Sequence, residues 1–462
     1  MILRRVLIAN RGEIAVRVIR TCRRLGIETV LAASDADLDS VPARLADGTI
    51  RLGPAAAAQS YLDVDAVVSA ARTVRADAIH PGYGFLSENR RLAQACAEAG
   101  IVFVGPTEAL LAAVGDKLEA RRHAVDAGLP VVPGAEVSDL RGAGGAAEEI
   151  GYPLLVKAVG GGGGRGMQPV HEPARLAETI ERATAEAGAA FGDPRVYLER
   201  LVTSGRHVEV QLLGDGENVI HLGDRDCSVQ RRYQKLVEEA PAPDLEDELR
   251  EEMRGAAVAF GEHLAYRGLG TVEFLVDRGR GTFHFLEMNA RIQVEHPITE
   301  EVCGVDLVAE QLAVAEGRPL RLTQRDVAFC GHAIECRVCA EDPAHDFRPN
   351  PGTVTEAGFP VGDGVRVDTH IEAGARVPPH YDSLLAKVIA HGHDRPDALA
   401  RLRGALACCE LGGVRTNVQV HADLLRDPGF AAGGVDTTWF PRFLARRLDA
   451  RERRRAPGSA HG

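Results

Sequence analysis

Over its first 113 residues the chain alternates short apolar runs with stretches that predict helices. The runs at 5–10 and 29–33 predict strands, and a helix is predicted between them from about Gly12 to Leu25. Further apolar runs at 78–84 and 101–106 end two more strand–helix units. Strands that alternate with helices predict a parallel, doubly wound sheet.

A helix predicted at 117–127 opens a second region that ends near residue 328. Its predicted strands lie at residues 154–159, 167–170, 207–211, 271–276 and 282–287. The third region has predicted strands at 332–338, 365–371 and 384–390, and closes with an amphipathic helix over 396–411. We therefore expect domains at 1–113, 114–328 and 329–448. The tail, 449–462, is rich in arginine and then in small residues, and is predicted to be disordered.

Composition narrows the class of protein. At 462 residues, with 45% hydrophobic and 26% charged residues, the chain is an ordinary globular protein of several domains. Its net charge of −12 argues against non-specific nucleic-acid binding. No apolar run approaches the ~20 residues that span a membrane. Nine cysteines, an odd number, indicate reduced cytosolic thiols, and Cys336 and Cys339 are better explained by packing than by a zinc or redox site.

The most informative segment is 287–297. If the chain is extended, Glu287, Asn289, Arg291, Gln293 and Glu295 all project to one face, because strand side chains alternate. A row of carboxylates, amides and one guanidinium can hold a metal ion, a small oxyanion and a base together. The alternative is a polar strand face at a sheet edge.

A hairpin signal at 277–281 separates two β-type runs. Pairing centred on Arg280 sets Glu273 opposite Glu287, with Cβ atoms roughly 4.5–5.5 Å apart. Two like charges so placed need a cation between them, and oxygen donors suit Mg²⁺ or Mn²⁺ bound with a phosphate. A register slip of one residue that keeps the two glutamates apart is the alternative.

A glycine run over 160–166 follows the strand that carries Lys157. It matches G-x-G-x-x-G, yet a strand follows it instead of the helix of a dinucleotide site, and the first turn at 10–13 lacks that fingerprint too. Bare glycine N–H groups between two strands can close on phosphate oxygens, and Lys157 adds a point charge. A hinge that binds no ligand is the alternative. His207, Glu209 and the charged stretch 224–241 add further polar groups, which a solvated loop would explain only in part.

Together these motifs resemble the biotin carboxylase family of ATP-grasp enzymes from Arg5 to about Leu448. The resemblance rests on segments 80–89, 157–167, 231–241 and 287–297. It implies an α/β and α+β multidomain architecture: a Rossmann-like pre-ATP-grasp domain, an ATP-grasp domain with a glycine-rich flap, and a β-barrel-like C-terminal domain. It also implies a homodimer.

The resemblance also implies roles for individual residues. The nucleotide would be held by Lys117, Lys157 and His207, by the flap glycines Gly162, Gly163 and Gly164, and by the hinge residues Glu199, Arg200, Leu201 and Val202. The metal ligands would be Glu273, Glu287 and Asn289, and the bicarbonate pocket Lys235, Arg291, Gln293 and Val294. Glu295 resembles the general base, and Arg337 the arginine that faces biotin. Tyr233 departs from the family, which usually has histidine there, near the nucleotide.

The implied reaction is ATP-dependent carboxylation of biotin by bicarbonate through carboxyphosphate, the first half-reaction of an acetyl-CoA or other acyl-CoA carboxylase, as in fatty acid biosynthesis. ATP and two Mg²⁺ or Mn²⁺ ions are expected. None of the four methionines precedes lysine, so biotin is expected on a separate carrier protein, with separate carboxyltransferase subunits. A cytoplasmic enzyme with neither nucleic-acid nor membrane partners is expected. Another ATP-grasp carboxylate–amine ligase and a non-catalytic nucleotide-binding regulator are the alternatives.

Overall fold

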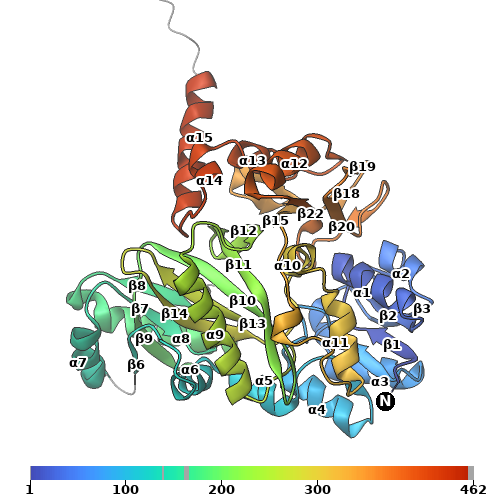
Figure 1. Cartoon of the computed structure of the whole chain (residues 1–462), viewed down its shortest axis with the longest axis horizontal. Helices are drawn as coiled ribbons and strands as arrows, with labels where there is room; N and C mark the ends of the chain where they lie inside the picture. Colours follow the sequence, from blue (N-terminus) through green and yellow to red (C-terminus); the bar gives the residue numbers. More distant parts are fainter. Residues whose placement is uncertain (1, 138–139, 161–165, 456–462) are drawn as a thin grey trace, which may run out of the picture.

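The computed structural model describes residues 2–137, 140–160 and 166–455. The chain forms an N-terminal region, a central region and a C-terminal region, and segments from all three meet in the middle of the molecule (Figure 1). The N-terminal and central regions lie side by side, and the C-terminal region covers them at the top of the view.

The N-terminal region is a five-stranded parallel sheet, as predicted. Its strands, in spatial order, are β3 (Gly48–Gly53), β2 (Glu28–Ser34), β1 (Arg5–Ile8), β4 (Ala78–His80) and β5 (Val102–Phe103). The helices of this region are α1 (Gly12–Arg24), α2 (Val41–Leu45), α3 (Val64–Thr73), α4 (Arg90–Glu98) and α5 (Glu108–Gly115). The central strands β1, β2 and β4 are buried on both faces, which explains their continuous apolar sequence.

An eight-stranded sheet forms the centre of the molecule. Its spatial order is β14 (Thr282–Asn289), β13 (Arg267–Asp277), β10 (Gly205–Asp215), β11 (Val219–Arg231), β12 (Gln234–Ala240), β15 (His332–Cys339), β22 (Leu384–Gly392) and β20 (Val365–Thr369). Because β12 pairs with β15, one sheet continues across the predicted boundary at residue 328. The domain boundaries therefore stay a prediction.

A separate four-stranded sheet carries the glycine run. It consists of β6 (Gly134–Glu136), β9 (Val196–Arg200), β7 (Leu154–Ala158) and β8 (Met167–Val170), with helices α6 (Lys117–Asp126), α7 (Leu140–Ile150) and α8 (Leu176–Phe191) nearby. The predicted strand after the glycines is confirmed, since β8 pairs antiparallel with β7. The flap residues Gly162, Gly163 and Gly164 lie outside the described residues.

The remaining helices complete the central and C-terminal regions. They are α9 (Asp247–His263), α10 (His296–Cys303), α11 (Leu307–Ala315), α12 (Arg395–Ala407), α13 (Val418–Leu424), α14 (Pro428–Ala432) and α15 (Trp439–Arg455). The short strands are β16 (Glu341–Asp342), β17 (Arg348–Pro349), β18 (Gly352–Thr353), β19 (Glu356–Gly358), β21 (Arg376–Val377) and β23 (Glu410–Gly412). The helix predicted over 396–411 is therefore too long, because residues 410–412 pair with β19.

The prediction of disorder from residue 449 is wrong for residues 449–455, where α15 continues to Arg455. The helix begins with Trp439, Phe440 and Phe443, which pack into the C-terminal core, and then stands away from the body (Figure 1). Alanine, arginine and glutamate in its last turns are good helix formers and can extend a helix that packing has started. Residues 456–462 lie outside the described residues.

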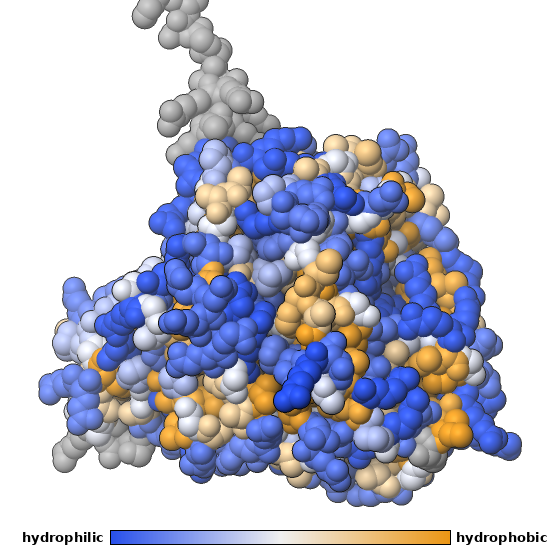
Figure 2. Space-filling model, in the orientation of Figure 1, coloured by the Kyte–Doolittle hydropathy of each residue, from blue (hydrophilic) through white to orange (hydrophobic). Residues whose placement is uncertain are grey.

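The surface shown in Figure 2 is mostly hydrophilic, with apolar residues in scattered patches. Within the described residues, none of the helices is both long enough and apolar enough to cross a membrane.

Candidate active site

Segment 287–295 does not remain extended as predicted, because strand β14 ends at Asn289. β14 is the edge of the large sheet, and helix α10 begins at His296 with Pro297 in its first turn. The chain turns between these elements, and Glu88 holds the turn by accepting bonds from the Ala290 N–H and the Arg291 Nε, each 2.9 Å long. The regular alternation is thus replaced by an irregular segment.

The polar side chains of this segment nevertheless gather around one carboxylate. The Glu273 Oε1 accepts bonds from the Asn289 Nδ2 at 2.8 Å and the Gln293 Nε2 at 3.0 Å. The Arg291 guanidinium donates to the Asn289 Oδ1 at 2.7 Å. The apolar residues Met288, Ala290 and Ile292 are buried. The polar residues Asn289 and Gln293 are buried as well, so the segment lies inside the site rather than on a sheet face.

The predicted hairpin pairing is confirmed: Glu273 lies directly opposite Glu287. An irregularity between Glu273 and Phe274 produces this register, since Phe274 pairs with Phe285. The two carboxylates contact different lysines, Glu273 with Lys235 at 3.1 Å and Glu287 with Lys117 at 3.7 Å. The like charges of the pair are therefore compensated separately.

Lys235 joins three buried carboxylates. Its Nζ lies 2.6 Å from a Glu209 oxygen, 3.1 Å from Glu273 and 2.6 Å from Glu295. Burial alone would lower the pKa of Lys235, but the surrounding acidic groups, Cys227 and Glu209 foremost, raise it well above its usual value. Lys235 is consequently a fixed cation at the centre of the cluster.

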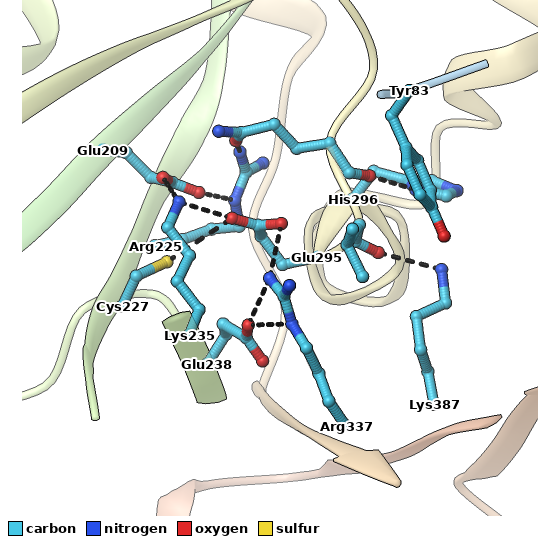
Figure 3. A network of polar contacts seen from close by, with 12 residues as sticks. Tyr83, Glu209, Arg225, Cys227, Lys235, Glu238, Glu295, His296, Arg337 and Lys387 are labelled. Atoms are coloured by element: carbon cyan, nitrogen blue, oxygen red, sulfur yellow. Dashed lines mark hydrogen bonds and ion pairs between the residues drawn. The ribbon is translucent and has the colours of Figure 1, made fainter. Parts of the chain in front are cut away.

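Glu295 is held between two cations (Figure 3). Besides Lys235, the Arg337 Nη2 contacts its Oε2 at 3.0 Å. Burial would raise the pKa of Glu295, yet Lys235, Arg337 and Arg225 together hold it well below the usual value. Glu295 is therefore an ionised acceptor, and loss of either cationic contact would make it a stronger base.

Glu238 binds the other side of Arg337. Its Oε1 accepts from the Arg337 Nε at 2.6 Å, and across the β12–β15 pair Glu238 lies opposite Glu335, which is also fully buried. Burial raises the pKa of Glu238 to about 7, although Arg337 opposes the rise. A carboxyl group next to the candidate biotin contact thus titrates near neutrality.

This titration predicts a pH-dependent stability difference. Between the ordinary pKa of 4.5 and about 7, the folded chain holds a proton on Glu238 that the unfolded chain has released. Stability from this group therefore falls as pH rises through that interval, by at most roughly 3–4 kcal/mol at roughly 1.4 kcal/mol per pH unit. Glu238→Gln does not titrate. Its thermal midpoint, relative to wild type, should rise between pH 5 and pH 8, and parallel curves would contradict the assignment.

Arg225 is a buried centre of hydrogen bonds beneath the same cluster. It is fully buried and donates to the side-chain oxygens of Glu209, Gln211, Thr271, Gln293 and Thr299. Through Glu209 it fixes a partner of Lys235, at 2.6 Å from the Arg225 Nε. Such a network supports the geometry of the contacting side chains and also satisfies an otherwise costly buried charge.

The predicted nucleotide lysines lie at the other end of the site. Lys157 is buried and its Nζ contacts Glu199 at 2.6 Å. Lys117 starts helix α6, and burial lowers its pKa, with Glu287 opposing and Lys157 adding to the effect. Glu199 and Arg200 end strand β9, and the backbone N–H of Leu201 bonds Pro153 at 3.1 Å. Arg200, Leu201 and Val202 line a cavity of about 340 Å³.

His207 lies against the acidic cluster. Its Nε2 is 3.0 Å from Glu273 and 3.7 Å from Glu209. Burial lowers the pKa of His207, but Glu273 more than offsets this and the net shift is upward. The ligand atoms of His207, Glu209 and Glu273 lie within 4.8 Å of one another, close enough to hold one metal ion. Carboxylate and amide oxygens of Glu273, Glu287 and Asn289 fit a hard divalent cation, once the lysine contacts are exchanged for it.

Tyr233 lies apart from these groups, in the turn between β11 and β12, where 56% of it is exposed. Arg232 and Tyr233 both have positive φ, 49° and 67°, as a tight hairpin turn requires. Tyr233, the residue that departs from the family pattern, is therefore exposed. Cys336 and Cys339 are buried in the sheet, in agreement with the packing interpretation.

Sequence reasoning assigned no role to Glu88, Arg225 or Glu238. His207 and Glu209 stand on the strand predicted at 207–211, and the structure pairs Glu209 of this strand with Arg225 of β11. Glu88 and Glu238 stand within segments 80–89 and 231–241, yet only the register and the turn after β14 show which arginines they bind. These contacts join segments that are far apart in the sequence, so local sequence patterns could not predict them.

Comparison with known proteins agrees with this geometry. The chain matches the biotin carboxylase N-terminal domain over residues 2–111, the ATP-binding domain of the carbamoyl-phosphate synthase L chain over 116–323, and the biotin carboxylase C-terminal domain over 335–442. It is 50% identical to the biotin carboxylase of Pseudomonas aeruginosa over 446 residues, which cover 96% of this chain and 99% of that protein.

Two solved structures are similar over nearly the whole chain. The Campylobacter jejuni biotin carboxylase in complex with β,γ-ATP is 40% identical, with a TM-score of 0.93 over 96% of this chain and 99% of its own. The biotin carboxylase domain dimer of Hydrogenobacter thermophilus 2-oxoglutarate carboxylase, with MgADP and bicarbonate, is 42% identical, with a TM-score of 0.92 over 96% and 98%.

Fold and site together define an ATP-grasp ligase, and the predicted fold class is confirmed. The chain belongs to the biotin carboxylase family. Its activity is the ATP-dependent carboxylation of biotin.

Proposed function

We propose that the cluster around Glu295 carries out bicarbonate activation and biotin carboxylation in one site. The observation that carries this proposal is the position of Glu295 between Lys235 at 2.6 Å and Arg337 at 3.0 Å. A carboxylate with a depressed pKa is ionised at neutral pH and becomes basic when a substrate takes over one of its cations. An anion such as bicarbonate is the substrate that would compete for these cations.

Bicarbonate binds next to Glu295 in this proposal. Arg291, Lys235, the Gln293 amide and the Val294 backbone form its pocket, and Glu295 removes its proton. The resulting dianion attacks the γ-phosphorus of ATP, while Lys117 and Lys157 neutralise the phosphate oxygens and His207 adds a further polar contact. Glu273, Glu287 and Asn289 would hold Mg²⁺, which would supply further charge neutralisation on the phosphates. The products are carboxyphosphate and ADP.

Biotin is carboxylated in the second step. Carboxyphosphate decays to CO₂ and phosphate, and the phosphate takes the proton from the biotin ureido nitrogen. Arg337 stabilises the resulting ureido oxyanion, because a guanidinium remains charged without a proton transfer, and the ureido nitrogen attacks CO₂ to form carboxybiotin. Carboxyphosphate hydrolyses readily in water, so water must be excluded from the site while carboxyphosphate is present. The residues Glu199 to Val202 are proposed to read adenine through their backbone.

The metal assignment predicts a changed Mg²⁺ requirement. Glu273→Gln and Glu287→Gln should each raise the Mg²⁺ concentration that gives half-maximal ATP turnover and leave the fold intact. The shift should be larger for Glu273, which contacts Lys235 and His207, than for the partly exposed Glu287. Titrating Mg²⁺ at saturating ATP measures it, with Glu262→Gln on the surface as a control. Unchanged Mg²⁺ dependence in both variants would contradict the ligand roles.

We also propose a homodimer that receives biotin on a separate carrier protein and passes it to carboxyltransferase subunits. The Hydrogenobacter thermophilus domain, 42% identical to this chain, forms a dimer, which supports the first part. Nine free cysteines fit a cytoplasmic, reducing location.

Measuring the molar mass by light scattering tests the proposed dimer. Adding a biotinylated carrier domain in place of free biotin tests the second part: a carrier that fails to lower the KM for biotin would count against it.

A further inference from the structure

Lys387, a lysine outside the cluster, is hydrogen-bonded to the main chain next to Glu295. Lys387 lies in the interior of β22, between β15 and β20, and its side chain is fully buried. A buried ammonium is costly unless it is paired and hydrogen-bonded. Its position in the sheet therefore requires specific partners.

The partners of Lys387 come from three different regions. Its Nζ donates to the Val294 carbonyl oxygen at 2.8 Å, contacts the Glu13 Oε1 at 3.1 Å, and lies 3.9 Å from the Asp368 Oδ2. Glu13 is in the first turn of α1 in the N-terminal sheet region, and the Tyr83 hydroxyl donates to the same Glu13 oxygen. Asp368 lies opposite Lys387 on β20. One ammonium thus links the N-terminal region, the C-terminal region and the catalytic segment.

The Val294 carbonyl and the Glu295 nitrogen belong to one peptide group. Fixing that carbonyl fixes the plane of the peptide, and with it the direction in which the Glu295 side chain leaves the backbone. This segment is neither strand nor helix, so no ladder of backbone bonds orients it. The hydrogen bond from Lys387 supplies an orientation that regular secondary structure does not provide.

Register places Lys387 beside Arg337. The two residues are cross-strand partners in the β15–β22 pair, so both side chains project from the same face. Figure 3 shows them reaching side by side towards the segment of Glu295. Arg337 binds the Glu295 carboxylate, and Lys387 binds the main chain just before it.

We propose that Lys387 is a positioning residue that holds the Val294–Glu295 peptide in the orientation needed for proton abstraction from bicarbonate. The inference rests on the proposed role of Glu295 as the base. Glu13 has a different part: it neutralises the ammonium but does not touch the catalytic segment. An amide in its place keeps an oxygen that can accept from the Lys387 ammonium, and Asp368 remains 3.9 Å from that ammonium.

The test uses Glu13→Gln and the double variant Lys387→Met with Glu13→Gln. The double variant removes both buried charges together, which avoids leaving a buried carboxylate without its cation and lets the protein fold. We expect Glu13→Gln to keep bicarbonate- and biotin-dependent ATP cleavage within about 3-fold of wild type. The double variant should lower kcat roughly 10–100-fold, since displacement by about 1 Å can cost 10²-fold, and leave the KM for ATP within about 2-fold.

Repeating both measurements with Glu295→Gln shows whether Lys387 acts through Glu295. If it does, the double variant should lower the residual rate by no more than about 2-fold in that background. An equal loss in both backgrounds, or a loss in Glu13→Gln as large as in the double variant, would overturn the positioning role. Wild-type activity of Glu295→Gln alone would instead refute the assignment of the base, so the two failures are distinguishable.

Discussion

Glu295→Gln should lower bicarbonate-dependent ATP cleavage by roughly 10²–10⁴-fold, because a positioned general base contributes about that factor. The amide keeps the shape of the side chain and can still accept from Lys235 or Arg337, which lie 2.6 and 3.0 Å from the carboxylate oxygens. It cannot accept a proton from bicarbonate. The fold and the KM for ATP should therefore change little while kcat falls.

A coupled assay for ADP at varied bicarbonate measures this effect. Glu248→Gln, an exposed glutamate in α9, is the matched control and should retain wild-type rates. A Glu295→Gln enzyme with kcat within a few-fold of wild type would show that another group removes the bicarbonate proton.

Arg337→Ala should uncouple the two steps. Removing one donor to a developing oxyanion typically costs roughly 10²–10³ in rate, so carboxybiotin formation should fall by about that factor. The slow ATP cleavage that occurs without biotin should persist. The rate of this ATP cleavage should decrease much less than the rate of carboxybiotin formation, because Lys235 still contacts Glu295 when Arg337 is removed.

Arg291→Ala provides the contrast for this experiment. Its guanidinium binds Glu88 at 2.9 Å and Asn289 at 2.7 Å, and we have proposed that it also holds bicarbonate. Both activities should therefore fall together in Arg291→Ala. Equal losses of ATP cleavage and biotin carboxylation in Arg337→Ala would refute the division of roles, as would selective loss of carboxylation in Arg291→Ala.

Local pattern in the sequence predicts most of the fold. Apolar runs alternating with helices predict the N-terminal parallel sheet, and the turn at 277–281 predicts the hairpin, in which an irregularity between Glu273 and Phe274 then sets Glu273 opposite Glu287. These features depend on neighbouring residues and on one short turn. The tail is the instructive failure: composition indicated disorder, but packing of Trp439 and Phe443 starts a helix that continues to Arg455.

The part of the site that local pattern could not predict depends on contacts between distant segments. Alternation predicted Glu287 to Glu295 on one extended face, whereas Glu88, about 200 residues earlier in the chain, holds the turn that ends the strand. Arg225 and Lys387 are single basic residues in buried strands, and only the sheet order places them under Glu295. The contacts of Arg225 and Lys387 depend on which strands are neighbours in the sheet, and the spacing of residues in the sequence does not show this.

The most direct test of the whole account is carboxylation of free biotin by the purified chain with ATP, Mg²⁺ and labelled bicarbonate. We predict acid-labile label on biotin that requires the chain, ATP and Mg²⁺, and one ADP formed per carboxybiotin after subtraction of the biotin-independent rate. Glu295→Gln should lower the rate of labelling by roughly 10²–10⁴-fold. Arg337→Ala should lower the labelling and retain the ATP cleavage that occurs without biotin. ATP turnover that is indifferent to bicarbonate and biotin, or full labelling by Glu295→Gln, would contradict the account.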